Sequence, residues 1–223
     1  MDVRNSSSPS SGWLVRAGRR LRVFWPAKML GMSAGMTVFF CGYFWALAHP
    51  SGAVTIMPLT PLDRLVPFQP AMLSFYLSLW VYVSLAPALI ADRRELLSYA
   101  VAAAALALAG LAVFVFWPTA VPPAGIDWSL YPGFAFLKAA DASGNACPSL
   151  HVAFAVFSAL WFQRLLREVG AGRAGHFINR FWCAGILYST LATRQHVALD
   201  VIAGAALGGM VAAANLHWLR RRA

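Results

Sequence analysis

Two short polar segments in the second half of the chain hold residues that could carry out chemistry. They are Thr193–Asp200 and Cys147–His151. His196 and Asp200 stand four positions apart, a spacing that puts two side chains on one face of a helix. A carboxylate that accepts a hydrogen bond from one imidazole nitrogen fixes the tautomer and leaves the other nitrogen free to attack or to take a proton. The spacing therefore predicts a nucleophile or base at His196, oriented by Asp200, with a purely structural pair as the alternative.

The segment Pro148-Ser149-Leu150-His151 is typical of the start of a helix. Proline fits the first turn, whose free backbone amides and positive dipole end bind anions. Ser149 adds a hydroxyl donor, and His151 could protonate a leaving oxygen. Simple capping by Ser149 is the alternative interpretation. Combined with the histidine–aspartate pair, the segment indicates a site that holds an anion and moves a proton.

The composition indicates that these residues lie in a membrane protein. Of 223 residues, 60% are hydrophobic and only 12% are charged, whereas a soluble domain is about a quarter charged. An ionisable residue inside an apolar run, such as Asp200, is costly to bury and usually has a partner and a function. The net charge of +10 does not indicate nucleic acid, because the basic residues form short clusters between apolar runs. Three scattered cysteines and the spacing of the histidines suggest no metal and no other cofactor.

Six apolar runs predict an all-α fold, a bundle of six transmembrane helices, each needing about 20 residues. The runs cover residues 29–48, 69–91, 96–117, 148–163, 177–192 and 197–218, the fourth being short. The first exceeds a usual signal-peptide core, so we expect an uncleaved anchor. We expect a basic tail at 1–27, disordered over Asn5–Ser11, a membrane domain at 28–218 and a basic end at 219–223.

Fifteen of the 18 lysines and arginines fall on one side of this six-helix layout. Only Arg64, Lys138 and Arg194 remain for the other side. Because basic residues accumulate on the cytoplasmic side, both termini should be cytoplasmic. We expect a bacterial inner membrane, in which His151 and His196 face outward, toward the periplasm.

Small residues in the last apolar run predict close packing between helices. Gly204 and Gly208 stand four positions apart and are followed by Gly209. Such spacing lets helix backbones approach closely in lipid. We expect this face to pack inside the bundle rather than to form a dimer, and the oligomeric state stays open.

These motifs resemble those of the type-2 phosphatidic acid phosphatases, which share a site architecture with vanadium haloperoxidases. Pro148–His151 matches the second motif of that family, Pro-Ser-Gly-His. Ser189–Asp200 matches the third, Ser-Arg-x5-His-x3-Asp. The Pro-Ser-Leu-His spelling looks closest to the branch that contains inositol phosphorylceramide synthase. The resemblance covers roughly residues 50–212.

The resemblance implies a phosphohistidine mechanism on a phospholipid or polyprenyl phosphate or diphosphate, without a metal. His196 would attack the phosphorus while Asp200 orients it. Ser149 would hold the phosphoryl oxygens, and His151 would protonate the leaving group. Water would complete hydrolysis in a phosphatase, whereas an alcohol or lipid hydroxyl would accept the group in a phosphotransferase.

The sequence departs from the family pattern in its cations. The first motif, Lys-x6-Arg-Pro, has no counterpart in residues 117–123, and Thr190 replaces the arginine of the third motif. A phosphoryl site needs positive charge. Arg194 is therefore the first candidate to bind the substrate phosphate, Arg64 the second and Lys138 the third, the last being equally well explained as a headgroup-snorkelling lysine.

Two other functions compete with phosphoryl transfer. The missing cations favour a non-catalytic membrane transporter or a degenerate scaffold of the same fold. An intramembrane protease built on Ser149 and His151 leaves the pairing of His196 with Asp200 unexplained.

Overall fold

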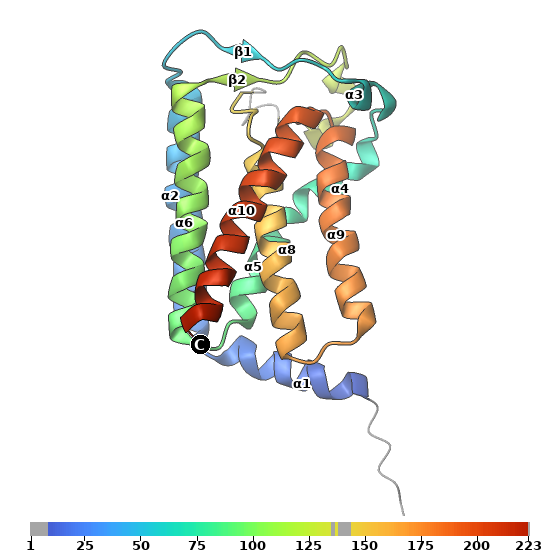
Figure 1. Ribbon diagram of the computed structural model, residues 1–223. Coiled ribbons are helices and arrows are strands. Elements are labelled where there is room, and N and C mark those ends of the chain that lie inside the picture. Colours follow the sequence, from blue (N-terminus) through green and yellow to red (C-terminus); the bar gives the residue numbers. More distant parts are fainter. Residues whose placement is uncertain (1–8, 135–136, 138–143, 223) are drawn as a thin grey trace, which may run out of the picture.

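The computed structural model describes residues 9–134, 137 and 144–222, and its backbone is mostly helical (Figure 1). Each of the six runs predicted to span a membrane coincides with a long helix or, in one case, with a pair of helices. They are α2 (Trp25–Ala48), α4 (Leu73–Leu77) with α5 (Leu79–Leu89), α6 (Arg93–Phe116), α8 (Leu150–Glu168), α9 (Arg173–Ala192) and α10 (Ala198–Arg222). Lys138 lies outside the described residues.

Helix α8 lies at the centre of the bundle and packs most extensively against α10, and also against α5 and α9. Its inward side chains Phe157, Trp161 and Leu165 are fully buried. Helices α2 and α6 form a neighbouring layer (Figure 1). The helix that carries His151 is therefore also the one at the core.

The boundaries of α6 show how local signals set the spans. Asp92 caps its start, because the carboxylate accepts the backbone N–H of Glu95 at 2.9 Å. The helix then continues without a further charged residue and ends at Phe116. Pro118 follows after one residue, and the residue before a proline is disfavoured in a helix. Sequence signals thus fix both ends of this span.

Four helical stretches among the described residues are long and apolar enough to cross a membrane. They are Trp25–Ala48, Pro70–Leu89, Arg93–Phe116 and Ala198–Arg222. Helices α8 and α9 are not among them, and both carry several charged or polar side chains, such as Arg164, Asn179 and Arg180. The prediction of six spans therefore stays a prediction.

The basic tail contains a helix that we did not expect from its sequence. Helix α1 (Pro9–Arg22) lies across one end of the bundle (Figure 1). Arg16 Nε donates to the carbonyl oxygen of Val169 at 2.7 Å, and Arg20 pairs with Glu168 at 2.8 Å. The expectation of disorder is thus corrected for residues 9–11, which belong to α1, whereas residues 5–8 lie outside the described residues.

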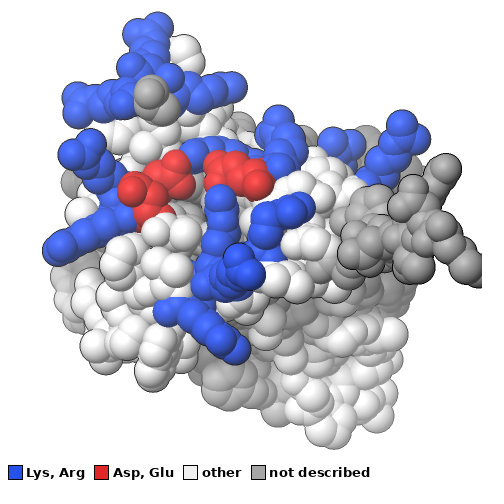
Figure 2. Space-filling view, turned by 90° about the horizontal axis from the view of Figure 1, so that it is seen from below, with Lys and Arg blue, Asp and Glu red and all other residues white. Residues whose placement is uncertain are grey.

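Basic side chains gather at the end of the bundle where α1 lies (Figure 2). They come from the last turns of α1, α8 and α10 and from the first residues of α6 and α9. Because α8 and α10 begin at the opposite end and α9 finishes there (Figure 1), Ser149, His151, His196 and Asp200 lie far from this basic end.

Short elements connect the helices at the site end. β1 (Thr55–Ile56) pairs in parallel with β2 (Thr119–Ala120), and Ala120 also forms a bridge with Gly144. The other connecting elements are α3 (Pro61–Leu65) and the 3-10 turns η1 (Pro70–Met72), η2 (Trp128–Leu130) and η3 (Pro132–Phe134). This strand pair is the one sheet in the described part of the chain, and only four of the described residues belong to its strands.

Candidate active site

The C-terminal end of α9 fixes the position of His196. The backbone N–H groups of Gln195 and His196 both donate to the carbonyl oxygen of Thr190, at 3.0 and 3.1 Å. The N–H of Arg194 donates to Leu191 O at 3.0 Å. This is the Schellman pattern, in which a left-handed residue, usually glycine, ends the helix. Arg194 occupies that position with a φ of 57°, at a cost of about 1 kcal/mol or more.

His196 lies before α10 and not on it, which corrects the expectation that it shares a helix with Asp200. The helix begins only at Ala198, because the backbone of His196 is held by the cap of α9. The two side chains nevertheless meet, with His196 Nδ1 3.5 Å from Asp200 Oδ2. This separation exceeds a good hydrogen bond. The contact leaves Nε2 as the nitrogen that could attack a substrate.

Asp200 also helps to start α10. It is the third residue of the helix, and its Oδ2 accepts the N–H of Val197 at 3.0 Å. This is the half of a capping box in which an acidic side chain reaches back to the residue before the helix. Asp200 is fully buried, and its Oδ1 has no hydrogen-bond partner among the described residues. Oδ2 of this carboxylate therefore binds the backbone, whereas Oδ1 stays available for another hydrogen bond.

Ser149 caps α8 and joins it to α10. Its Oγ accepts the N–H of Val152 at 3.3 Å, and its own N–H donates to the carbonyl oxygen of Asp200 at 3.0 Å. The capping interpretation is therefore correct for Ser149, although its hydroxyl proton can still donate to an anion. Pro148 stands before the capping residue, so it does not lie in the first turn as we expected.

His151 is the second residue of α8 and packs between aromatic rings. Its imidazole stacks on Tyr76, with ring centroids 4.0 Å apart and planes at 14°, and its centroid lies 6.3 Å from that of Trp80. Its Nε2 is buried without a hydrogen-bond partner in the described structure. The imidazoles of His151 and His196 are close enough to interact electrostatically. The predicted acid therefore lies near the predicted nucleophile.

Two glycines of α10 bring these residues together. A Cβ on Gly204 would lie 2.3 Å from the carbonyl oxygen of Ser149, and one on Gly208 would lie 2.1 Å from that of Ala153. Both distances are too short for any side chain, so the backbones of α8 and α10 touch directly. The predicted internal packing role is confirmed for Gly204 and Gly208. At Gly209 the nearest atom outside the helix backbone would be 4.0 Å away.

Asp63 supports the site, and we did not identify it from the sequence. The carboxylate is 3% exposed, and its Oδ1 accepts the N–H of Ala198 at 2.7 Å, at the start of α10. Its Oδ2 accepts the backbone N–H and the hydroxyl of Thr60, both at 2.7 Å. The Thr-x-x-Asp spacing of residues 60–63 is a capping-box signal. That signal predicts a short helix, but it does not predict the hydrogen bond to the start of α10.

Arg194 is tied to the same short helix. Its Nη1 donates to the carbonyl oxygen of Asp63 at 2.9 Å, and its Nη2 donates to that of Val66 at 2.8 Å. The guanidinium therefore fastens the turn between α9 and α10 to α3. Arg64, by contrast, has an exposed side chain on α3.

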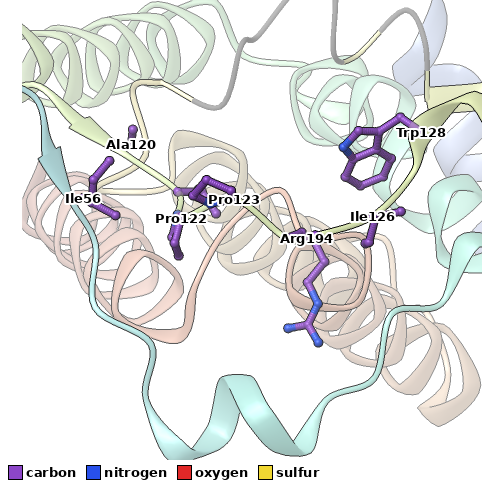
Figure 3. A pocket seen from close by; sticks show the side chains of 10 residues that line it. Ile56, Ala120, Pro122, Pro123, Ile126, Trp128 and Arg194 are labelled. Carbon is purple, nitrogen blue, oxygen red and sulfur yellow. The ribbon is translucent and has the colours of Figure 1, made fainter.

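Arg194 also borders a pocket of about 410 Å³ at the site end. The extended segment 120–126 forms one wall, with Ile56 and Trp128 beside it (Figure 3). This segment includes part of the stretch that lacks the first family motif, so apolar residues and prolines stand opposite Arg194. His151, Ser149, His196 and Asp200 are not among the residues that line the pocket.

Cys147 precedes the site, and its thiol is unreactive at neutral pH. Burial raises the pKa of its thiol to about 11, and the negative charge of Asp200 acts in the same direction. The thiol is therefore protonated at neutral pH and is not a nucleophile. Its backbone N–H donates to Thr119 Oγ1 at 2.8 Å, which ties this segment to β2.

Within the described ranges, no group of three or more histidine, cysteine or acidic residues could hold a metal ion.

A family model described as the PAP2 superfamily matches residues 96–223, more than half of the chain. The chain belongs to the PAP2 superfamily. The match contains both site histidines and Asp200 but not Asp63. No curated protein and no solved structure was found to match. Members of the superfamily are generally phosphatases, and with its apolar helices this PAP2 protein is a membrane protein of the phosphatase type.

Proposed function

We propose that this PAP2 protein is a lipid-phosphate phosphatase or phosphotransferase that forms a phosphohistidine at His196. One observation carries the proposal: His196 Nδ1 lies against the Asp200 carboxylate, and the first turn of α8, with Ser149 and His151, packs against the same aspartate. This arrangement leaves an oriented imidazole nitrogen next to a helix start, where an anion is favoured.

In the first step, Nε2 of His196 attacks the phosphorus and the bond from phosphorus to the leaving oxygen breaks. His151 donates a proton to that oxygen. In the second step, water or an acceptor hydroxyl attacks the phosphorus, the P–N bond breaks, and His151 takes the proton back. Asp200, whose Oδ2 lies 3.5 Å from Nδ1 in this structure, moves within hydrogen-bond distance of Nδ1–H and stabilises the positive charge on the ring. Positioning and charge stabilisation supply most of the catalysis in such transfers.

A bound phosphate would also satisfy groups that have no hydrogen-bond partner among the described residues. His151 Nε2 would gain a phosphate oxygen or the leaving oxygen as its partner. The Ser149 hydroxyl can donate to a phosphoryl oxygen. We propose Arg194 as the main cation, because it stands two residues before His196 and its two carbonyl acceptors use only two of its five guanidinium N–H groups. Arg64 and Lys138 stay secondary candidates.

We propose a lipid substrate that approaches from the outer, periplasmic or luminal, side. The basic end of the bundle supports this orientation, because lysine and arginine accumulate on the cytoplasmic side. The site then lies at the other membrane surface, where a headgroup can reach it while its chains stay in the bilayer. Transfer to an alcohol or lipid acceptor uses the same residues as hydrolysis.

The test is phosphate release by the detergent-purified protein. The substrates are phosphatidic acid, phosphatidylglycerol phosphate and a polyprenyl diphosphate, each with and without an alcohol acceptor. We expect His196→Ala to lower kcat by about 1,000-fold or more and Asp200→Asn by about 100-fold, because the nucleophile and its orienting group act as a unit. His217→Ala is the matched control, because that histidine is exposed near the C-terminal end of α10, far from His196.

Trapping provides an independent readout. With 32P-labelled substrate, rapid acid-free quenching should give a labelled protein in the wild type and in His217→Ala but not in His196→Ala. Release that persists unchanged in His196→Ala would refute the mechanism. If none of the substrates releases phosphate or transfers it, the non-catalytic transporter or scaffold becomes the better explanation.

A further inference from the structure

We infer that a second pocket, at the basic end of the bundle, binds a phosphate-bearing anion. In the membrane, this anion is the headgroup of an anionic phospholipid. The pocket has a volume of about 430 Å³ and lies between the end of α8 and the start of α9. It is lined by Gln163, Arg167, Arg173, His176, Phe177 and Arg180. Nothing in the proposed catalytic mechanism uses these residues.

No carboxylate among the described residues forms an ion pair with the arginines of this pocket. Three arginines line it, and none of the described residues that line it is acidic. The nearby glutamates are engaged elsewhere: Arg164 binds Glu95 and Glu168, and Arg20 also binds Glu168. The three arginines are exposed, and together they make the local potential positive, which favours an anion between them. Arginine forks match the oxygens of a phosphate particularly well.

The backbone and one buried nitrogen add to this preference. Helix α9 begins at Arg173 behind Gly172, which offers no side chain to cap the free amides of the first turn. The positive end of the helix dipole favours an anion at that place. In addition, His176 Nδ1 is buried without a hydrogen-bond partner among the described residues. A phosphate oxygen would be a suitable acceptor for this nitrogen in the tautomer in which it carries a hydrogen.

An apolar strip that starts at the pocket favours a lipid over a soluble anion. Phe177 lines the pocket and is 68% exposed, and the exposed Ile178 and Phe181 continue along α9. The rings of Phe177 and Phe181 stack, with centroids 6.1 Å apart. Acyl chains can lie against this strip while the headgroup binds the arginines. Basic pockets between helices at the cytoplasmic face are known to hold anionic headgroups.

The inference is independent of the proposed catalysis. Helix α8 has 19 residues, which corresponds to about 28 Å at 1.5 Å per residue. Ser149 and His151 stand at its start, whereas Gln163 and Arg167 stand near its end. A lipid bound here therefore occupies a place that is separate from the substrate.

Lipid titration of the full-length, delipidated protein, followed by native mass spectrometry, tests the site. The probes are phosphatidylglycerol, phosphatidylcholine and soluble pyrophosphate. The pocket variant is Arg167→Gln/Arg173→Gln/Arg180→Gln. The control is Arg220→Gln/Arg221→Gln/Arg222→Gln, which removes the same charge from the same end. At physiological salt we expect the pocket variant to weaken phosphatidylglycerol binding by about tenfold or more, and the control by less than about threefold.

A further variant distinguishes the two sources of the anion. If the ligand is a lipid, Phe177→Ala should weaken binding of phosphatidylglycerol and leave binding of pyrophosphate unchanged. Tight pyrophosphate binding that only the pocket variant abolishes would assign the same anion site to a soluble phosphate. Equal losses in the pocket variant and the control, in samples that both elute as monodisperse protein, would overturn the inference.

Discussion

Arg194 shapes the site through both its backbone and its side chain. Its backbone takes the left-handed conformation that ends α9, and its side chain binds two carbonyls of the α3 region. Strained non-glycine residues of this kind persist where surrounding contacts hold them, and they cluster at functional sites. Glycine would suit the backbone better, so the side chain is the reason that an arginine fits this position.

Comparing Arg194→Gly with Arg194→Ala separates the two properties. Both variants lose the guanidinium, so phosphate release should fall at least tenfold in each if Arg194 binds the substrate. Alanine keeps the left-handed strain that glycine relieves, so the glycine variant should be more stable than the alanine variant by about 1 kcal/mol. Thermal unfolding in detergent measures the difference in stability. Equal activity in the wild type and both variants would remove Arg194 from the phosphate site.

Spacing alone identified the histidines, the serine and the aspartate that the structure brings together. Spacing did not predict how the backbone of His196 is held in place. That depends on the three hydrogen bonds that cap the C-terminal end of α9. It also missed Asp63, whose bond to Ala198 joins residues 135 positions apart. Local patterns carry no information about such a distant partner.

Hydropathy predicted the long helices well because a membrane span must satisfy its backbone internally. The same signal is weak for α1, whose arginines alternate with apolar residues over only 14 positions. It also could not show that the fourth run lies at the core, or that α8 and α9 are less apolar than the other four stretches. Their polar residues serve other helices, as in the 2.6 Å hydrogen bond from Tyr82 to Asn179.

The contact between α8 and α10 is the element most sensitive to a single methyl group. Gly204→Ala places a carbon against the Ser149 carbonyl, which must move and take the first turn of α8 with it. We expect a loss of stability of about 1–3 kcal/mol and a clear loss of phosphate release. Gly208→Ala should destabilise similarly but disturb the site less, because its contact, Ala153, lies one turn farther from Ser149.

Gly209→Ala is the matched control for these variants, because a methyl group there meets nothing closer than 4.0 Å. It should unfold at the wild-type temperature or slightly above, since alanine favours a helix. If Gly204→Ala were as stable and active as Gly209→Ala, the direct contact of the two backbones would be wrong.

The two ends of the molecule along its long axis differ. Basic residues gather at one end, and the candidate site lies at the other. If the positive-inside rule sets its orientation, Leu130→Cys at the site end should react with a membrane-impermeant maleimide added outside intact cells. Ala174→Cys at the basic end should react only after lysis. The wild type, which has three cysteines, gives the background. The reverse pattern would place the site in the cytoplasm.

The bonds from Asp63 have a consequence for how the protein can be divided. Asp63 lies before the region that matches the PAP2 family, yet its side chain and its carbonyl bind Ala198 and Arg194 within that region. A fragment or chimera that begins at residue 96 would leave a buried amide and a guanidinium without acceptors. The family region is therefore not a transplantable module, and exchanges between relatives should carry α3 along with it.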